Sequence, residues 1–255
     1  MQIGKILKNI KQAYKKHTFT KLVFDSKKCS KGSIFFSIRG NKINGNNFIN
    51  DAIKNGANTI ISDRKFEGYK NKVLYLYSKN PRLCLSEAAS NFYKLKPKNL
   101  LAVTGTNGKS SIVNFYFQIL RLNNINSSTI GTLGINSKSF VLKSNNTTLD
   151  PVTLHQILFK LKKSKIDNCI LEASSHGLDQ NRLDGLKFDT AIFSNFSRDH
   201  LDYHKSYKNY LNSKLILFKK LLKKKGQIIF DNDVEEANII KKIIKKNKNK
   251  FLCIG

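Results

Sequence analysis

Residues 103–111, VTGTNGKSS, have the types and the order that suit a phosphate-binding turn. Gly105 and Gly108 permit a tight turn and a close approach of backbone amides to an anion, and the start of a helix adds a favourable dipole. Lys109 is placed to reach the outer phosphates, and Ser110 to ligate magnesium. The full pattern G-x-x-x-x-G-K-[ST] requires a glycine where Val103 stands. Taken alone, the motif therefore leaves open a strand-to-helix turn with no role in binding.

Polar side chains also follow two later apolar runs. In ILEASSHGLDQNRLDG, Glu172 comes just past an apolar strand and before a polar loop, and in IFSNFSRDHLDYH, Arg198, Asp199 and His200 follow the end of another strand. These groups would lie at strand ends, on the same side of the fold as the phosphate loop. A carboxylate and an imidazole placed there are suitable ligands for a nucleotide-bound divalent cation. Each residue alone would more often lie on the surface, so the joint placement carries the interpretation.

The elements that must position these groups alternate between apolar strands and amphipathic helices from residue 98 onward. This alternation predicts an α/β fold with a mainly parallel sheet covered on both faces, with ligands beyond the carboxyl ends of the strands. We expect strands at 99–105, 127–131, 168–174, 189–195, 226–230 and 250–255, and helices at 109–122, 152–164, 206–224 and 234–246.

Residues 1–97 predict a separate small α/β domain, and Pro97 marks its boundary with a second domain at 98–255. The pattern predicts an opening helix, strands at 20–25, 33–38 and 58–62, and a helix at 48–57. The segment RGNKINGNNF between the second strand and that helix is polar and contains two glycines. This composition indicates a loop that is able to contact a ligand.

The formal net charge of +29 raises the possibility of a nucleic-acid partner. Only six of the 46 basic residues are Arg, and the lysines are spread along the whole chain. Proteins that recognise bases and phosphates favour arginine, whose guanidinium group can make two parallel hydrogen bonds, so we expect no nucleic-acid partner. We interpret the Lys-rich runs as solvated helix faces. The four cysteines form no C-x-x-C pair, and no segment has the length of a membrane span. These features predict a cytoplasmic protein without a membrane partner.

Four segments in one order connect the chain to a known family. GTNGKSS, NTTLDP, EASSHGLDQNRLDG and NFSRDHLDYHKSYKNYLNSK resemble the Mur ligases, most closely the MurE type. The N-terminal segment FDSKKCSKGSIFFSIRGNKINGNNFINDAIKNGANTII resembles the UDP-binding domain of that family. The short phosphate loop of the family does not require the glycine missing at 103. Related enzymes that glutamylate folate share a similar loop, but the serines before His176 and the run through His204 favour the MurE type.

The resemblance implies a site whose residues can be placed one by one. For ATP it implies Gly105, Thr106, Asn107, Gly108, Lys109, Ser110 and Ser111. For Mg²⁺ it implies Ser110 and Glu172 at one ion and His200 at a second. For the UDP end of the substrate it implies Ser26, Asn41 and Lys42, and for the muramoyl dipeptide Asn146, Thr147, Thr148, Ser174, Gln180 and Arg182.

Lys214 matches the lysine that this family carbamylates, so that a cation becomes an anionic metal ligand. Repulsion by nearby magnesium ions would lower the pKa of the amine and let it capture carbon dioxide. Read from the residues alone, Lys214 is one more lysine on a helix rich in them. Lys109, Glu172, His200 and carbamylated Lys214 form the catalytic set that the resemblance implies.

The implied reaction is ATP-dependent amide formation, in which a third amino acid is added to UDP-N-acetylmuramoyl-L-alanyl-D-glutamate through an acyl phosphate. Enzymes of the family carry a C-terminal domain that this chain does not match. We therefore expect a shortened ligase whose third domain is absent. A separate protein chain is one way in which that C-terminal domain could be supplied. A non-catalytic fragment that retains UDP-substrate or ATP binding is the first alternative, and a basic nucleic-acid ATPase the second. The sequence does not identify the added amino acid.

Overall fold

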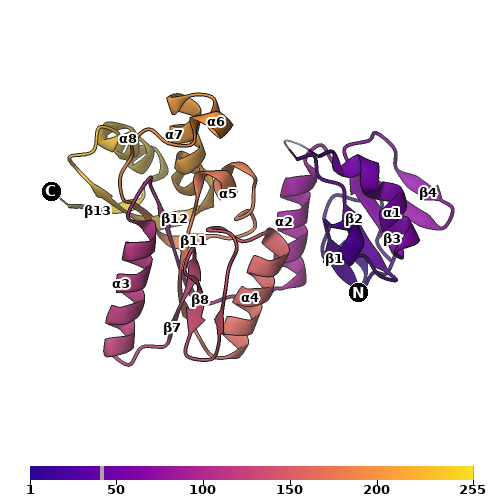
Figure 1. The fold of residues 1–255 in the computed structure, drawn as a ribbon, viewed down its shortest axis with the longest axis horizontal. Coiled ribbons are helices and arrows are strands. Elements are labelled where there is room, and N and C mark those ends of the chain that lie inside the picture. The colour runs from indigo at the N-terminus through magenta and orange to yellow at the C-terminus, as the bar shows by residue number, and fades with distance from the viewer. Residues whose placement is uncertain (41–42, 255) are drawn as a thin grey trace. The chain divides into compact units, whose positions relative to one another are not determined.

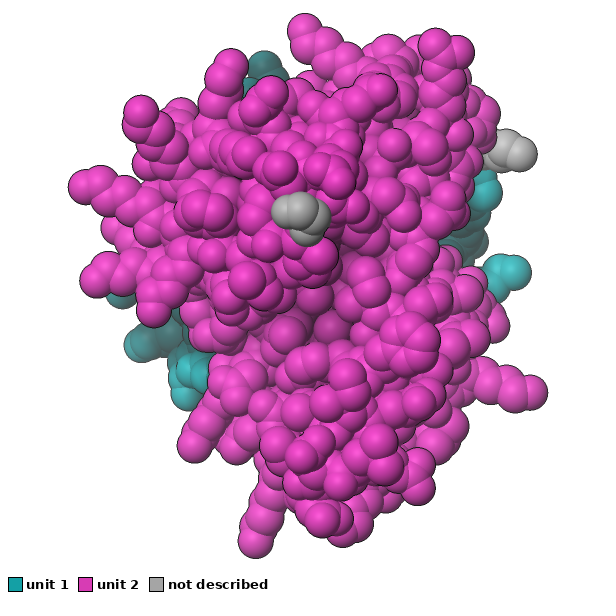
Figure 2. Space-filling model, turned by 90° about the vertical axis from the view of Figure 1, so that its left-hand side faces the viewer, with its two compact units in different colours: residues 1–94 teal, residues 95–255 magenta. Residues whose placement is uncertain are grey.

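The computed structural model describes residues 1–40 and 43–254, and the chain divides into two compact units, Met1–Lys94 and Leu95–Gly255 (Figures 1 and 2). The sequence pattern placed the boundary at residue 97. Within the described residues, no helix is both long and apolar enough to cross a lipid bilayer. Figure 2 shows long side chains projecting into solvent from one face of the second unit, as expected for a chain so rich in lysine.

The first unit is a small α/β domain. Its described residues form a sheet in the order β1-β2-β3-β5-β4, in which β4 is antiparallel to β5 and the other neighbours are parallel. The strands are β1 (Lys21–Val23), β2 (Ser33–Phe36), β3 (Ala57–Ser62), β4 (Gly68–Lys70) and β5 (Val73–Tyr77), and the helices are α1 (Ile49–Lys54) and α2 (Pro81–Phe92).

The predicted opening helix of this unit is wrong. The segment instead forms two short 3₁₀ turns, Ile3–Lys5 and Gln12–Tyr14. The amide of Ile3 donates to the carbonyl of His17 at 2.8 Å, and that of Gly4 to the carbonyl of Lys15 at 3.1 Å. Backbone hydrogen bonds across the segment thus replace those that a continuous helix would make, while the buried Ile3 and Ile6 still reach the core.

The second unit contains a larger sheet in the order β13-β12-β11-β6-β10-β7-β8-β9. All neighbouring strands from β13 to β7 are parallel, and β8 is antiparallel to both of its neighbours. The predicted α/β fold with a mainly parallel sheet is therefore confirmed. The strands are β6 (Asn99–Thr104), β7 (Ser127–Gly131), β8 (Gly134–Ser137), β9 (Val141–Leu142), β10 (Asn168–Glu172), β11 (Phe188–Phe193), β12 (Leu222–Asp231) and β13 (Lys250–Ile254).

Helices cover both faces of this sheet, as Figure 1 shows for α3 (Lys109–Leu122) and α4 (Pro151–Lys163). On one side, Val113 of α3 packs with Val103 and Ile170. On the other, α4 packs its buried face with Ala102 and Leu171. Successive strand residues point to opposite faces, so each buried strand needs apolar residues throughout. The remaining helices are α5 (Ser175–Asp179), α6 (Leu201–His204), α7 (Tyr207–Ile216) and α8 (Ala237–Asn247).

The predicted helix at 206–224 is too long. Helix α7 ends at Ile216, a π-helical turn spans Leu217–Leu221, and β12 begins at Leu222 rather than at 226. Leu222 is buried and pairs with Phe188 of β11. Pairing with this neighbouring strand therefore places the residues from 222 onward in the sheet and not in the helix. The short hairpin strands β8 and β9 were not predicted, because two to four residues give little periodicity.

His155, in α4, has no exposed surface. Burial, and secondarily the positive charge of Lys96, lowers its pKa to about 3. At this site the unfolded chain, with a histidine pKa near 6.5, therefore binds more protons than the folded chain between about pH 3 and 6.5. The contribution of His155 to stability thus rises with pH across that window. We expect His155→Leu to flatten the pH dependence of the unfolding free energy by up to about 1.4 kcal/mol per pH unit. Urea unfolding at several pH values measures this, and parallel curves for the two proteins would contradict it.

Candidate active site at the carboxyl ends of the central strands

The phosphate-type loop joins the end of β6 to the start of α3. Gly105 has a φ of +148° and Gly108 a φ of +81°, both in the region that favours glycine. A Cβ at Gly105 would lie 1.9 Å from Ser194 Oγ, so this position also requires glycine for space. Helix α3 begins at Lys109, and the amides of its first turn have no acceptor within the helix. They are available to an anion.

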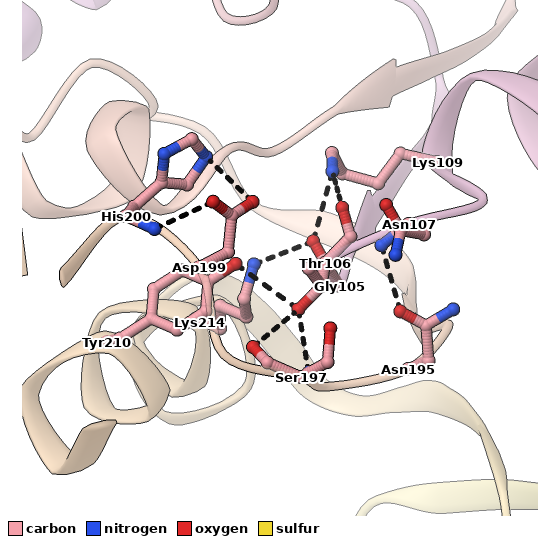
Figure 3. A network of polar contacts seen from close by, with 10 residues as sticks. All are labelled: Gly105, Thr106, Asn107, Lys109, Asn195, Ser197, Asp199, His200, Tyr210 and Lys214. Atoms are coloured by element: carbon pink, nitrogen blue, oxygen red, sulfur yellow. Dashed lines mark hydrogen bonds and ion pairs between the residues drawn. The ribbon is translucent and has the colours of Figure 1, made fainter.

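The segment that follows β11 braces this loop (Figure 3). Asn195 accepts hydrogen bonds from two loop amides, through its carbonyl from Thr106 (3.0 Å) and through its side chain from Asn107 (2.8 Å). The Thr106 hydroxyl accepts from the amide of Ser197 at 3.0 Å and lies 3.3 Å from Tyr210 Oη. These contacts fix the loop before any ligand arrives, which lowers the entropy lost on binding.

Lys109 folds back over the loop that precedes it. Its Nζ donates to the carbonyls of Gly105 (3.0 Å) and Thr106 (2.8 Å). Burial lowers the pKa of the Lys109 ammonium, while Glu172 and Asp199 act in the opposite direction. The ammonium thus lies at the loop, where it can reach a bound phosphate.

Glu172 and Ser110 meet beside this helix start. Glu172 is 2% exposed, and its Oε1 accepts from Ser110 Oγ at 2.9 Å and from the amide of Thr132 at 2.8 Å. Its Oε2 accepts from the Thr132 hydroxyl at 3.2 Å. A Cβ at Gly131 would lie 2.2 Å from Oε1, so a glycine makes room for the carboxylate. A buried carboxylate and a hydroxyl are hard oxygen donors of the kind that Mg²⁺ prefers.

Lys214 reaches the same loop from α7. The residue is 2% exposed, and its Nζ donates to the carbonyl of Gly105 at 2.6 Å and lies 4.4 Å from the centre of the Tyr210 ring. Burial first, and then the charge of Lys109, lowers the pKa of the Lys214 amine to about 7, with Asp199 acting in the opposite direction. A substantial fraction of this amine is therefore neutral and nucleophilic near pH 7.

His200 stands at the start of α6 and is nearly half exposed. Its Nε2 lies 3.4 Å from Asp199 Oδ2, and its ring centre lies 4.9 Å from that of His176. Burial first, and then neighbouring histidine charge, lowers the pKa of His176 and that of His204. Among the residues that the structure describes, no group of three or more His, Cys, Asp or Glu side chains is arranged to hold a metal.

The residues expected at the dipeptide form a connected network, with one exception. Thr148 Oγ1 donates to the carbonyl of Glu172 (2.8 Å) and accepts from the amide and the hydroxyl of Ser174. Arg182 donates to the carbonyl of Thr148 (2.8 Å) and twice to the side chain of Gln180. The hydroxyl oxygen of Thr147 lies 3.0 Å from that of Thr132, and this contact connects Thr147 to the network. The exception is Asn146, whose described hydrogen bonds go to Ser144.

Three expected residues belong to the first unit. Ser26 begins a 3₁₀ turn, is 7% exposed, and accepts a hydrogen bond from Asn55 through its carbonyl. Asn41 and Lys42 lie outside the described residues. In the second unit, the remaining loop residue Ser111 is exposed in the first turn of α3.

Sequence reasoning missed three residues that shape the site. Thr132 holds both oxygens of Glu172, Asn195 holds two loop amides, and Tyr210 lies against both Lys214 and Thr106. Thr132 follows a buried strand directly, which is the same signal that drew attention to Glu172. Asn195 and Tyr210 lie within a motif that was recognised, but nothing in their spacing indicated a contact with the loop.

Comparison with known proteins gives two family matches and a set of curated relatives. Residues 103–255 match the model of the Mur ligase middle domain, and residues 18–93 that of the Mur ligase family catalytic domain. A UDP-N-acetylmuramoyl-L-alanyl-D-glutamate–2,6-diaminopimelate ligase of Rickettsia bellii is 42% identical over 96% of this chain and 51% of its own length. One of the same name from Bradyrhizobium diazoefficiens is 38% identical over 84% of this chain and 44% of its own. The chain spans about half the length of the curated relatives it matches.

Solved structures agree with this pattern. A UDP-N-acetylmuramoyl-L-alanyl-D-glutamate–2,6-diaminopimelate ligase matches with a TM-score of 0.85 and 28% identity, over 99% of this chain and 52% of that one. MurF ligase from Thermotoga maritima, solved in complex with ADP, matches with a TM-score of 0.60 and 17% identity, over 91% of this chain and 49% of that one. At that identity the second likeness concerns the fold alone.

Proposed function

The chain belongs to the Mur ligase family, and from this membership we propose that it takes part in ATP-dependent amide formation on a UDP-muramoyl peptide. The substrate is UDP-N-acetylmuramoyl-L-alanyl-D-glutamate, and the added amino acid is 2,6-diaminopimelate, as in the names of its relatives. In this proposal residues 1–97 bind the UDP end through Ser26, Asn41 and Lys42, and residues 98–255 bind ATP and the dipeptide.

The observation that carries the proposal is the meeting of three separate segments at one loop. Lys109 and Ser110 from the start of α3, Glu172 from the end of β10 and Lys214 from α7 all contact the loop or one another within hydrogen-bond distance. A triphosphate with its metal ion is bound by such groups: cationic side chains and helix amides contact the phosphate oxygens, and hydroxyl and carboxylate oxygens contact the metal.

The proposed reaction has two steps. An oxygen of the D-glutamyl carboxylate attacks the γ-phosphorus of ATP, the bond to the β-phosphate oxygen breaks, and ADP leaves. The amine of the incoming amino acid then attacks the carbon of the acyl phosphate, and phosphate leaves as the amine nitrogen loses a proton. Since carboxylate and triphosphate are both anions, the chief task of the site is to align them and screen their repulsion.

The residues of this chain divide that task. The first-turn amides of α3 and Lys109 hold the phosphates, and Lys109 exchanges two backbone carbonyls for phosphate oxygens. Ser110 and Glu172 would hold one Mg²⁺, and His200 with carbamylated Lys214 a second. When bound, these ions would neutralise charge on the triphosphate. Asn146, Thr147, Thr148, Ser174, Gln180 and Arg182 would orient the dipeptide.

The test of this proposal is phosphate release from ATP with Mg²⁺, the UDP-dipeptide and 2,6-diaminopimelate, alongside calorimetric titration with ADP and with the UDP-dipeptide. We expect both ligands to bind, and phosphate release to require all substrates. Binding of both ligands without turnover would favour the alternative, a non-catalytic fragment that retains substrate or nucleotide binding. A chain that binds neither ligand would overturn the proposal.

Glu172→Gln tests the metal role separately from the shape of the site. The amide side chain can still accept from Ser110 and Thr132 but has lost the charge that attracts a divalent cation. We expect the gain in ATP affinity on adding Mg²⁺ to fall about tenfold or more, with little change in affinity without the ion. Glu235→Gln, at an exposed carboxylate, is the matched control. An unchanged magnesium dependence in Glu172→Gln would reject the assignment.

A further inference from the structure

An open pocket of about 490 Å³ lies at the far end of α3 from the phosphate loop. The last turn of α3, the turn that follows it, the start of β7 and the end of β8 line it, with Phe117, Arg121, Ser127 and Lys138 among its residues. Helix α3 rises about 1.5 Å per residue, so its two ends are about 20 Å apart. A small molecule in this pocket could not touch the phosphate loop.

The pocket carries positive charge that is not engaged elsewhere. Arg121 and Lys138 both line it, no carboxylate does, and neither cation belongs to an ion pair among the described residues. The carbonyls at the end of α3 have other partners: that of Leu120 accepts from the amide of Ile125, and that of Arg121 from the amide of Asn124. The Arg121 guanidinium is therefore not needed to cap the helix and can serve a ligand.

Ser127 adds an observation of a different kind. The residue lines the pocket and is 3% exposed, and its buried hydroxyl has no hydrogen-bond partner among the described residues. Buried hydroxyls are nearly always paired, because an unpaired one has lost water without replacement. A ligand oxygen that enters the pocket, with a small shift of the side chains around it, would supply the missing partner.

Apolar and amide groups complete the lining. Phe117 offers an aromatic surface and Ile125 an aliphatic one, while Asn124 and Asn126 carry side-chain amides that can donate. The volume falls in the range of ordinary small-molecule sites, which are apolar clefts with a few polar groups that fix orientation. Two cations and a hydroxyl select an anionic group, and the aromatic surface selects a flat ring attached to it.

We propose that this pocket binds a small organic anion, a phosphate or carboxylate carried on a flat ring, at a site separate from the phosphate loop. The guanidinium of Arg121 and the ammonium of Lys138 hold the anionic group, and Ser127 donates to it. The ring lies against Phe117. The site is independent of the ligase proposal, since none of its residues belongs to the machinery assigned above.

The test is titration of the whole chain with phenyl phosphate, benzoate and inorganic phosphate, followed by backbone amide NMR shifts. We expect phenyl phosphate or benzoate to shift the amides of Asn126, Ser127 and Lys138 with a dissociation constant of about 1 mM or below, the range of fragment-sized ligands. The tighter of the two identifies the anion. Inorganic phosphate should bind the pocket at least tenfold more weakly, because it has no ring.

Variants give the decisive comparison. Arg121→Gln and Lys138→Gln should each weaken the ring anions at least fivefold, while Lys160→Gln, at an exposed lysine of α4, should change nothing. Ser127→Ala should weaken binding yet raise the urea midpoint of unfolding, because it removes an unpaired buried hydroxyl. Shifts confined to residues 105–111, unchanged affinity in both charge variants, or inorganic phosphate binding as tightly as phenyl phosphate would overturn the proposal.

Discussion

For the proposed ligase reaction, replacement of Lys214 by alanine is expected to lower turnover by about 10³-fold or more, the size of effect that follows loss of one charge-stabilising group in an active site. The reason is the environment of the amine: 2% exposed, in contact with the carbonyl of Gly105, and with a pKa lowered to about 7. In the proposed role, the neutral amine would attack dissolved carbon dioxide, with formation of a C–N bond and loss of a proton, and the carbamate would present anionic oxygen where a cation stood. Without it, the proposed second metal loses a ligand.

Two measurements separate this role from a structural one. With ¹³C-labelled bicarbonate, the wild-type chain should show a carbamate resonance that Lys214→Ala lacks and that Lys208→Ala, an exposed lysine on the same helix, retains. In the turnover assay, a small added carboxylate should partly restore Lys214→Ala by occupying the vacated space. Full turnover in Lys214→Ala, or an unchanged carbamate resonance, would reject the role.

Gly105→Ala is expected to destabilise the second unit by about 2–4 kcal/mol and to weaken ADP binding at least tenfold. The new Cβ would lie 1.9 Å from Ser194 Oγ and 3.0 Å from the backbone of Asn195, at a φ that side chains rarely adopt. Relief of these contacts requires a shift of the Ser194 side chain and of the Asn195 backbone, and Asn195 carries the hydrogen bonds that hold Thr106 and Asn107.

Gly108→Ala is the matched comparison. It shares the positive φ but has open space, since its Cβ would lie 3.8 Å from Ser194, so we expect only the backbone penalty of about 1–2 kcal/mol. Combining Gly105→Ala with Ser194→Ala removes the closest contact and should recover part of the lost stability, a coupling that a double-mutant cycle measures. Urea unfolding gives the stabilities. A Gly105→Ala chain as stable as the Gly108→Ala chain would contradict the steric argument.

Helix and strand types followed from periodicity wherever burial was regular. Helix α8 is an example: Ile240, Ile243 and Ile244 are buried while its lysines are exposed, as the alternating runs predicted for a solvated face. The prediction was wrong at the N-terminus and at the end of α7. In both places backbone partners distant in sequence took hydrogen bonds that local pattern assigned to a helix.

The contacts among the site residues follow a similar division. The carboxyl ends of parallel strands share one edge of a sheet, so the sequence could place Ser110 and Glu172 near each other, and their side chains are 2.9 Å apart. The sequence could not show that Thr132 would hold the same carboxylate, because that contact depends on the neighbouring strand in the sheet order, which is not the next one along the chain.

The sequence by itself determined the family, the mainly parallel sheet and the residue types of the phosphate loop, because short-range spacing and apolar periodicity fix local geometry. Only the tertiary structure decided why Gly105 must be glycine and why the amine of Lys214 has a low pKa. Both depend on groups about 90 to 110 residues away along the chain, Ser194 in the first case and the loop at Gly105 in the second. Steric exclusion and desolvation act through space, so chain packing alone sets them.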